Sequence, residues 1–184
     1  MEYLELFDEA NLPLGQLLPR RQVHEQGHWH RTAQIFIWHP QLGFLCHQRS
    51  KSKDLFPSLW DVSIGGHLNP HETYLSCATR ELKEELGIEA TPQELHHIAT
   101  MSIDGQDVVA QLLDREHAGI FLYQTSSEAT AFDFQKEEIE EVAYLTAAQL
   151  KKDLTSKSFS RTYIPLQQQF LYMLHLIEAY LQKQ

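Results

Sequence analysis

The sequence contains only two cysteines, Cys46 and Cys77, among 184 residues. Two cysteines provide neither a disulfide framework nor a zinc-binding pattern. No apolar run is long enough to span a bilayer, and the acidic N-terminal segment lacks the hydrophobic core of a secretion signal. We therefore expect a protein of the reducing cytoplasm that has no membrane partner.

Basic residues are also scarce, since 15 Lys and Arg stand against 25 Asp and Glu, for a formal net charge of −10. This balance argues against general affinity for a nucleic acid polymer or an anionic membrane, although it is compatible with a nucleotide as a small substrate. The hydrophobic content of 42% in 184 residues is enough for one domain with a sizeable core. No linker, repeat or low-complexity segment divides residues 1–184.

The most informative segment runs from Gly66 to Ile88 and reads GHLNPHETYLSCATRELKEELGI. It fills every position of the pattern G-x5-E-x7-R-E-U-x-E-E-x-G-U, where U is aliphatic. Between Glu72 and Leu86 there is no Pro or Gly, and good helix formers predominate, so this part is expected to be a helix. Gly87 is placed to end that helix.

Three carboxylates, Glu81, Glu84 and Glu85, are spaced so that they share one face of the expected helix. Carboxylates this close repel one another unless cations lie among them, so the cluster indicates a bound divalent ion. Hard oxygen ligands suit Mg²⁺, with Mn²⁺ as the alternative. Arg80 can hold Glu72 or Glu81 in a fixed orientation through its planar guanidinium group. A solvated surface helix would also carry such charges, but it would not require the glycine and glutamate upstream.

This pattern resembles the Nudix box, and the resemblance implies metal-assisted cleavage of a diphosphate linkage. It also implies an α+β fold, with a mixed β-sheet sandwiched between α-helices. The Gly65 carbonyl is then a further metal ligand, which the absence of a Cβ at both Gly65 and Gly66 permits sterically. By this resemblance the metal ligands are Gly65, Glu81, Glu84 and Glu85, and the catalytic residues are Arg80, Glu81 and Glu85. The general base is either Glu81 or a residue of a later acidic segment, namely Glu137, Glu138, Glu140 or Glu141.

A second resemblance covers about residues 24–145 and is carried by the runs WHRTAQIFIW and QRSKSKDLFPSLWDVSIGGH. It is to the Nudix branch related to isopentenyl diphosphate isomerase, whose catalytic cysteine aligns with Gly65. Since neither cysteine of this chain replaces that thiol, hydrolysis is favoured over isomerisation. A non-catalytic Nudix metabolite sensor is a further alternative, against which the complete set of box glutamates argues.

The isomerase resemblance also implies a second metal site for Mn²⁺ or Zn²⁺, outside the box helix. Its candidate ligands are His30, His67 and Glu116, with His24 and Asp114 as weaker candidates. The alternative is that these are ordinary polar residues, because the chain has 11 histidines. The candidate substrate-binding residues are Arg49 and Lys53, which lie in a basic segment, and Glu72 of the box.

Hydrophobic patterning predicts a core at about residues 30–150, an N-terminal strand extension and a C-terminal amphipathic helix. The expected strands are 3–7, 32–38, 44–48, 61–64, 96–103, 119–125 and 142–146, with a turn at 11–15 and an irregular segment at 104–118. The expected helices are 20–24, 72–86, 147–154 and 165–182. For the last helix, packing on its own domain is favoured over a homodimer contact.

Overall fold

The structure is a computed structural model that describes residues 2–156 and 161–184. Its α-helices are α1 (Arg20–Gln26), α2 (Tyr74–Leu86), α3 (Ala147–Thr155) and α4 (Gln167–Leu181), and its 3-10 turns are Pro92–Glu94 and Ala129–Ala131. Its strands are β1 (Tyr3–Phe7), β2 (Pro13–Pro19), β3 (His30–His39), β4 (Gly43–Arg49), β5 (Trp60–Asp61), β6 (Ile64–His67), β7 (Leu95–Asp107), β8 (Leu112–Gln124) and β9 (Ile139–Leu145).

A mixed sheet of seven strands forms the centre of the protein. Its main path is β5-β4-β3-β8-β7, while β6 pairs with β3 and β9 pairs with β4. Strands β3 and β8 run parallel, from the pair His30 and Glu116 to the pair Trp38 and Gln124, and the other pairings of the sheet are antiparallel. Strands β1 and β2 form a separate two-stranded sheet.

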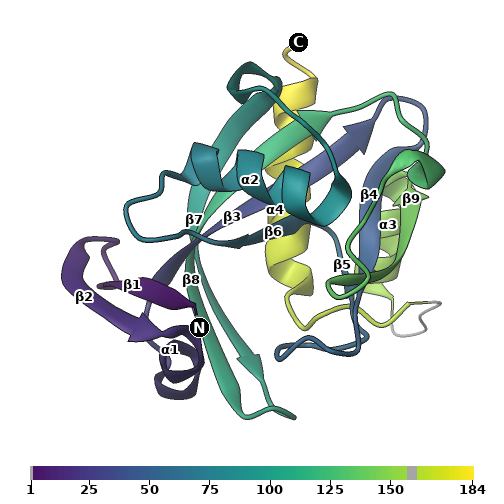
Figure 1. Ribbon diagram of the computed structural model, residues 1–184. Helices are drawn as coiled ribbons and strands as arrows, with labels where there is room; N and C mark the ends of the chain where they lie inside the picture. The colour runs from purple at the N-terminus through teal and green to yellow at the C-terminus, as the bar shows by residue number, and fades with distance from the viewer. Residues whose placement is uncertain (1, 157–160) are drawn as a thin grey trace.

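Helices cover both faces of the central sheet, as the α+β expectation requires. Helix α2 crosses one face and α4 the other, while α1 and the β1–β2 hairpin lie at one end of the sheet (Figure 1). One apolar cluster joins Leu82 of α2 to Ile35 of β3 and Ile64 of β6, and another joins Phe170 of α4 to Phe36. The protein is therefore a sandwich of helices around a mixed sheet.

The C-terminal helix packs on its own domain, as the sequence favours. Phe170, Met173, Leu174 and Ile177 of α4 are at most 1% exposed within the cluster that includes Leu150 of α3. No helix among the described residues is long and apolar enough to cross a membrane. The apolar stripe of α4 is thus accounted for by the core of this chain.

Most expected elements are confirmed, and three expectations were wrong. The expected strand 61–64 is two strands, because the Asp61 carboxylate accepts the backbone N–H groups of Val62 (2.7 Å) and Ser63 (3.3 Å) and turns the chain between them. The expected irregular segment 104–118 belongs to the long β7–β8 hairpin, whose ladder extends to Asp107 and Leu112. The expected turn at 11–15 overlaps β2, which pairs with β1.

Candidate active site

Helix α2 ends at Leu86 as expected, but it starts at Tyr74, two residues later than the expected Glu72. Thr73 caps its N-terminus by accepting the backbone N–H of Ser76 at 3.2 Å, while the Ser76 hydroxyl accepts the N–H of Thr73 at 3.0 Å. Gly87 ends the helix with φ of 69°, a left-handed conformation that glycine adopts without strain. The helix therefore begins just after Glu72, which lies in the preceding loop, and carries the other acidic residues of the box.

Arg80 ties the acidic residues of the box together. Its guanidinium group donates hydrogen bonds to Glu72 (3.0 and 3.1 Å), Glu81 (2.6 Å), Glu84 (3.0 Å) and the carbonyl of His67 (2.9 Å). This confirms the expectation that Arg80 orients neighbouring carboxylates. Because Glu72 also accepts the backbone N–H of Asn69 at 2.8 Å, it is held as part of this network.

Two of the box carboxylates are buried. Burial raises the pKa of Glu85 to about 8, and the nearby Lys53 offsets only part of that shift. Burial also raises the pKa of Glu81, although Arg80 opposes the change. No hydrogen bond of the Glu85 carboxylate is found within the described part of the chain. A buried carboxylate without a partner is suited to binding a cation.

Gly65 and Gly66 lie at the closest approach of β6 to its neighbours. A Cβ on Gly65 would come within 1.9 Å of the Ala33 carbonyl oxygen, and one on Gly66 would come within 2.4 Å of Glu81 Oε1. Neither position has room for a side chain unless its neighbour moves. The second contact shows that Gly66 leaves the space that the Glu81 carboxylate occupies.

A cavity of about 420 Å³ lies beside the box helix. Its acidic lining includes Glu81, Glu84, Glu85, Glu116 and Glu138, and its basic lining includes Arg20, Arg49, Lys53 and Arg80. Gly65, Gly66 and His67 also line it, whereas Glu72 does not. The structure thus brings Arg49 and Lys53 to the box carboxylates and places Glu72 behind Arg80.

The cations of the cavity differ in how they are held. Lys53 pairs with Glu138, and Arg49 donates two hydrogen bonds to the Leu55 carbonyl, at 3.0 and 3.2 Å. Arg20, at the start of α1, is 3.6 Å from Glu2 and 3.8 Å from an Asp54 oxygen, beyond hydrogen-bonding distance in both cases. The sequence analysis missed Arg20 and Glu2, since neither belongs to a motif.

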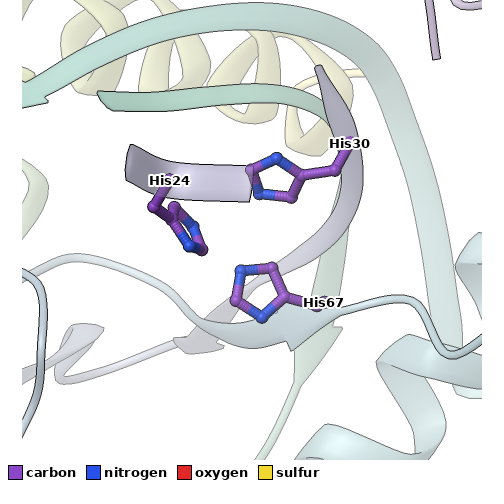
Figure 2. Close-up of side chains that lie close together, drawn as sticks. All are labelled: His24, His30 and His67. Carbon is purple, nitrogen blue, oxygen red and sulfur yellow. The ribbon is translucent and has the colours of Figure 1, made fainter. Parts of the chain in front are cut away.

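Three histidines from α1, β3 and β6 converge on one another, and one of them, His67, lines the cavity (Figure 2). The ring centroids of His24, His30 and His67 are 5.0 to 5.3 Å apart, and one nitrogen of each ring lies within 4.8 Å of the others. His24 Nε2 and His30 Nε2 are buried and have no hydrogen-bond partner among residues 2–156 and 161–184. Buried imidazole nitrogens that face one another and make no hydrogen bond are a suitable ligand set for a metal ion.

Two acidic residues of β8, Asp114 and Glu116, lie next to the three histidines, and His30 is close to both the histidines and the acidic pair. A ligand atom of His30 lies within 4.8 Å of those of Asp114 and Glu116. Asp114 Oδ1 is 3.4 Å from His24 Nε2. Burial, followed by the Asp114 charge, raises the pKa of Glu116, although Gln34 donates a hydrogen bond to it at 3.0 Å. The structure therefore brings together the five residues considered for a second metal site, including the two weaker candidates.

Known proteins resemble this chain in sequence and in fold. The NUDIX domain family model matches residues 28–167. An uncharacterised Nudix hydrolase of Clostridium acetobutylicum is 33% identical over 159 residues, which cover 85% of this chain and 75% of that protein. An isopentenyl-diphosphate Delta-isomerase of Serratia proteamaculans is 33% identical over 120 residues, 65% of this chain and 66% of the isomerase.

A crystal structure from Deinococcus radiodurans shows the same fold. It superposes with a TM-score of 0.73 at 20% identity, covering 95% of this chain and 99% of the other. The family match spans well over half of the chain, and it contains the whole box, the strands that carry Arg49, Glu116 and His67, and the helix that carries Arg80. The chain belongs to the Nudix family and is a Nudix pyrophosphohydrolase, within the branch related to isopentenyl diphosphate isomerase.

Proposed function

We propose that the protein is a Mg²⁺- or Mn²⁺-dependent hydrolase of a diphosphate linkage in a nucleoside di- or triphosphate, or in another diphosphate-linked metabolite. The substrate is a small molecule, and the expected place of action is the cytoplasm. The observation that carries the proposal is that a single cavity holds carboxylates for a metal and cations for a diphosphate, namely Glu81, Glu84, Glu85, Arg20, Arg49 and Lys53.

The metal ligands in this proposal are Glu81, Glu84, Glu85 and the Gly65 carbonyl. These residues would hold a divalent ion, which when bound would supply positive charge to offset the diphosphate and polarise its oxygens. Arg80 contributes by holding Glu81 and Glu84 in place through hydrogen bonds of 2.6 and 3.0 Å. The raised pKa of buried Glu85 fits a carboxylate that gains its natural counter-charge from the ion.

The diphosphate is held by cations on the other side of the cavity. Arg20 is the most readily available, because its ion pairs within the described part of the chain, with Glu2 and Asp54, are 3.6 Å or longer. Lys53 exchanges its Glu138 partner for a phosphate oxygen, and Arg49 adds a fixed positive charge. Glu72 acts through Arg80, since it lies outside the cavity lining.

Two carboxylates of the cavity are suited to accept the proton of the attacking water. Glu81 is oriented by Arg80, and Glu138 is the one member of the later acidic group that lines the cavity. Release of Lys53 to the diphosphate would free Glu138 at the moment when a base is needed. Glu138→Gln decides between them, because loss of the base at Glu138 would remove the acidic limb of the pH–rate profile while metal affinity is kept. An unchanged acidic limb in this variant would leave Glu81, which is also a proposed metal ligand, as the base.

A second divalent ion is proposed at the histidine cluster, held by His24, His30, His67, Asp114 and Glu116. Imidazole ligands favour Mn²⁺ or Zn²⁺ over Mg²⁺, so the two metal sites would differ in preference. The buried Nε2 atoms of His24 and His30 support this assignment, because they make no hydrogen bond within the described residues and lie 3.4 and 3.9 Å from the same Asp114 oxygen.

Isomerisation of isopentenyl diphosphate is the second candidate, and it is favoured by the likeness to the Serratia proteamaculans isomerase. The position of the isomerase cysteine is Gly65, where a Cβ would meet the Ala33 carbonyl oxygen at 1.9 Å. The two cysteines of the chain are buried, Cys46 in β4 and Cys77 in α2, and burial raises the pKa of each thiol and makes it a poor acid. Hydrolysis is therefore the better supported reaction.

The deciding experiment is a phosphate-release screen of the purified protein with Mg²⁺ or Mn²⁺. It covers nucleoside di- and triphosphates, dinucleotide cofactors, nucleotide sugars, thiamine diphosphate and isopentenyl diphosphate, with Glu85→Gln as the matched control. Turnover that is lost in the variant supports the hydrolase. Conversion of isopentenyl diphosphate to its isomer without phosphate release would overturn it in favour of the isomerase, and tight binding without turnover would favour a sensor.

A further inference from the structure

The three clustered histidines share a pattern in their other ring nitrogen. His24 Nδ1 is 2.9 Å from the Arg20 carbonyl, His30 Nδ1 is 3.1 Å from the His28 carbonyl, and His67 Nδ1 is 3.0 Å from Glu2 Oε1. Each of these oxygens can only accept a hydrogen bond, so each Nδ1 must carry the proton. The Nε2 atoms are consequently the ones with a free lone pair, and these are the atoms that would bind a metal.

The three oxygens that accept these Nδ1 hydrogen bonds belong to different kinds of group. His24 and His30 are oriented by backbone carbonyls four and two residues away, which the local fold supplies regardless of side chains. His67 depends on a side chain, and that side chain is 65 positions distant in the sequence. The orientation of His67 is therefore the one that a single substitution far from the cluster can change.

Glu2 is itself held in place. Its carbonyl accepts the backbone N–H of Arg20 at 3.0 Å, and its carboxylate is 3.6 Å from the Arg20 guanidinium group. The following strand β1 is anchored by Leu4 and Leu6, each 1% exposed against Val23 of α1. The Glu2 carboxylate is therefore held next to His67 by a segment of chain that is itself fixed in place.

We propose that Glu2 is a positioning residue of the histidine metal site, where it fixes the tautomer and ring orientation of His67 so that Nε2 faces His24 and His30. The proposal rests on the second metal site proposed above. Carboxylates in this outer position orient metal-binding histidines, and their loss weakens metal affinity by about 10- to 100-fold. As a mere ion pair, with the Glu2 side chain 39% exposed, the contact would contribute little.

The test is a calorimetric titration of the metal-free protein, once with Mn²⁺ and once with Zn²⁺. Wild type is compared with Glu2→Ala and Glu2→Gln, with His30→Ala to identify the histidine site and Glu9→Gln as the control for a nearby exposed carboxylate. We expect Glu2→Ala to weaken the histidine site by 10- to 100-fold without changing the carboxylate site. Glu2→Gln should lose less, because its amide oxygen still accepts the hydrogen bond.

Two outcomes separate the inference from the function on which it rests. If Glu2→Ala binds metal as tightly as Glu9→Gln while His30→Ala removes one class of site, Glu2 has no positioning role. If His30→Ala changes nothing, the metal site itself is wrong. Nitrogen chemical shifts of His67 give a readout without metal, since Nδ1 should carry the proton in wild type and exchange between tautomers in Glu2→Ala. A purely structural role for Glu2 would lower the melting temperature and leave metal affinity and tautomer unchanged.

Discussion

Replacing Glu85 with Gln should remove catalysis and, in the absence of metal, should also make the protein more stable at alkaline pH. Burial holds the pKa of Glu85 at about 8, whereas its ordinary value is 4.5. The folded protein therefore binds more protons than the unfolded chain between these two pH values, so its stability falls as the pH rises. The stability gained by keeping Glu85 protonated is fully present below about pH 4.5 and is lost as the pH passes through about 8.

The size of this effect follows from the pKa change. At about 1.4 kcal/mol per pH unit, moving the pKa from 4.5 to about 8 corresponds to roughly 5 kcal/mol of unfolding free energy as an upper bound. Relaxation around the ionised group should reduce the measured loss to about 1–3 kcal/mol. Glutamine has nearly the same shape and no charge, so the variant should lack this loss entirely.

The assay is denaturant unfolding of both proteins at pH 5, 7 and 9, first with a chelator and then with Mg²⁺. We expect the wild-type curve to fall with pH relative to Glu85→Gln in chelator and to recover with Mg²⁺, because the ion replaces the missing counter-charge. Turnover of the best substrate should fall by several orders of magnitude in the variant. Parallel pH curves for the two proteins, or retained turnover in the variant, would refute the reasoning.

Three other substitutions test the remaining parts of the site. Arg80→Lys should lower kcat at least about tenfold while the circular dichroism spectrum is kept, because the three donors of lysine cannot replace the five hydrogen bonds that the planar guanidinium group donates to oxygen atoms. Wild-type kcat in this variant would contradict the role of Arg80. Lys53→Met should raise KM about tenfold, which corresponds to about 1.4 kcal/mol for one charged hydrogen bond, and should weaken the salt dependence of KM. An unchanged KM would show that Lys53 does not bind the substrate. Gly66→Ala should reduce metal affinity with little change in melting temperature, since the new Cβ would displace the end of the Glu81 side chain. Calorimetry with Mg²⁺ measures this affinity, and an unaltered value would show that Glu81 can move without weakening metal binding.

The box helix and its site were accessible from the sequence because their determinants are local. Residues 72–87 carry a cap, an apolar face and a stop within one segment, and the acidic residues follow from helical spacing. The orienting role of Arg80 needed only this local geometry, whereas the Gly65 carbonyl was proposed as a ligand from the family resemblance. Local rules therefore predict the part of the protein that a single helix and its flanking loop build.

The β7–β8 hairpin was less accessible because its residues serve the site. Asp114 and Glu116 interrupt the apolar pattern of β8, so residues 104–118 appear irregular in sequence although a continuous ladder joins the two strands. Similarly, Asp61 divides an apparent strand by binding the backbone beyond it. In both places polar residues occupy strand positions for a reason other than core packing, and hydrophobic patterning detects only core packing.

Glu2 and Arg20 could not be found from spacing, because each matters only through partners far along the chain. Glu2 reaches His67, and Arg20 enters the cavity after α1 folds against β8. Even the histidine cluster was suggested by family resemblance and not by the order of its residues. Long-range pairing decides these contacts, and one sequence without its fold does not contain a local signal for them.

The register of β3 has a consequence for how the protein can be studied. His30 is paired directly with Glu116 on one side of this strand, and Thr32 is paired with His67 on the other. A slip of one residue would turn alternate side chains to the opposite face and separate the histidines from the acidic group. Binding of a coloured or paramagnetic metal at the cluster would therefore report correct strand alignment, so that its appearance during refolding would mark the moment at which β3, β6 and β8 reach their native pairing.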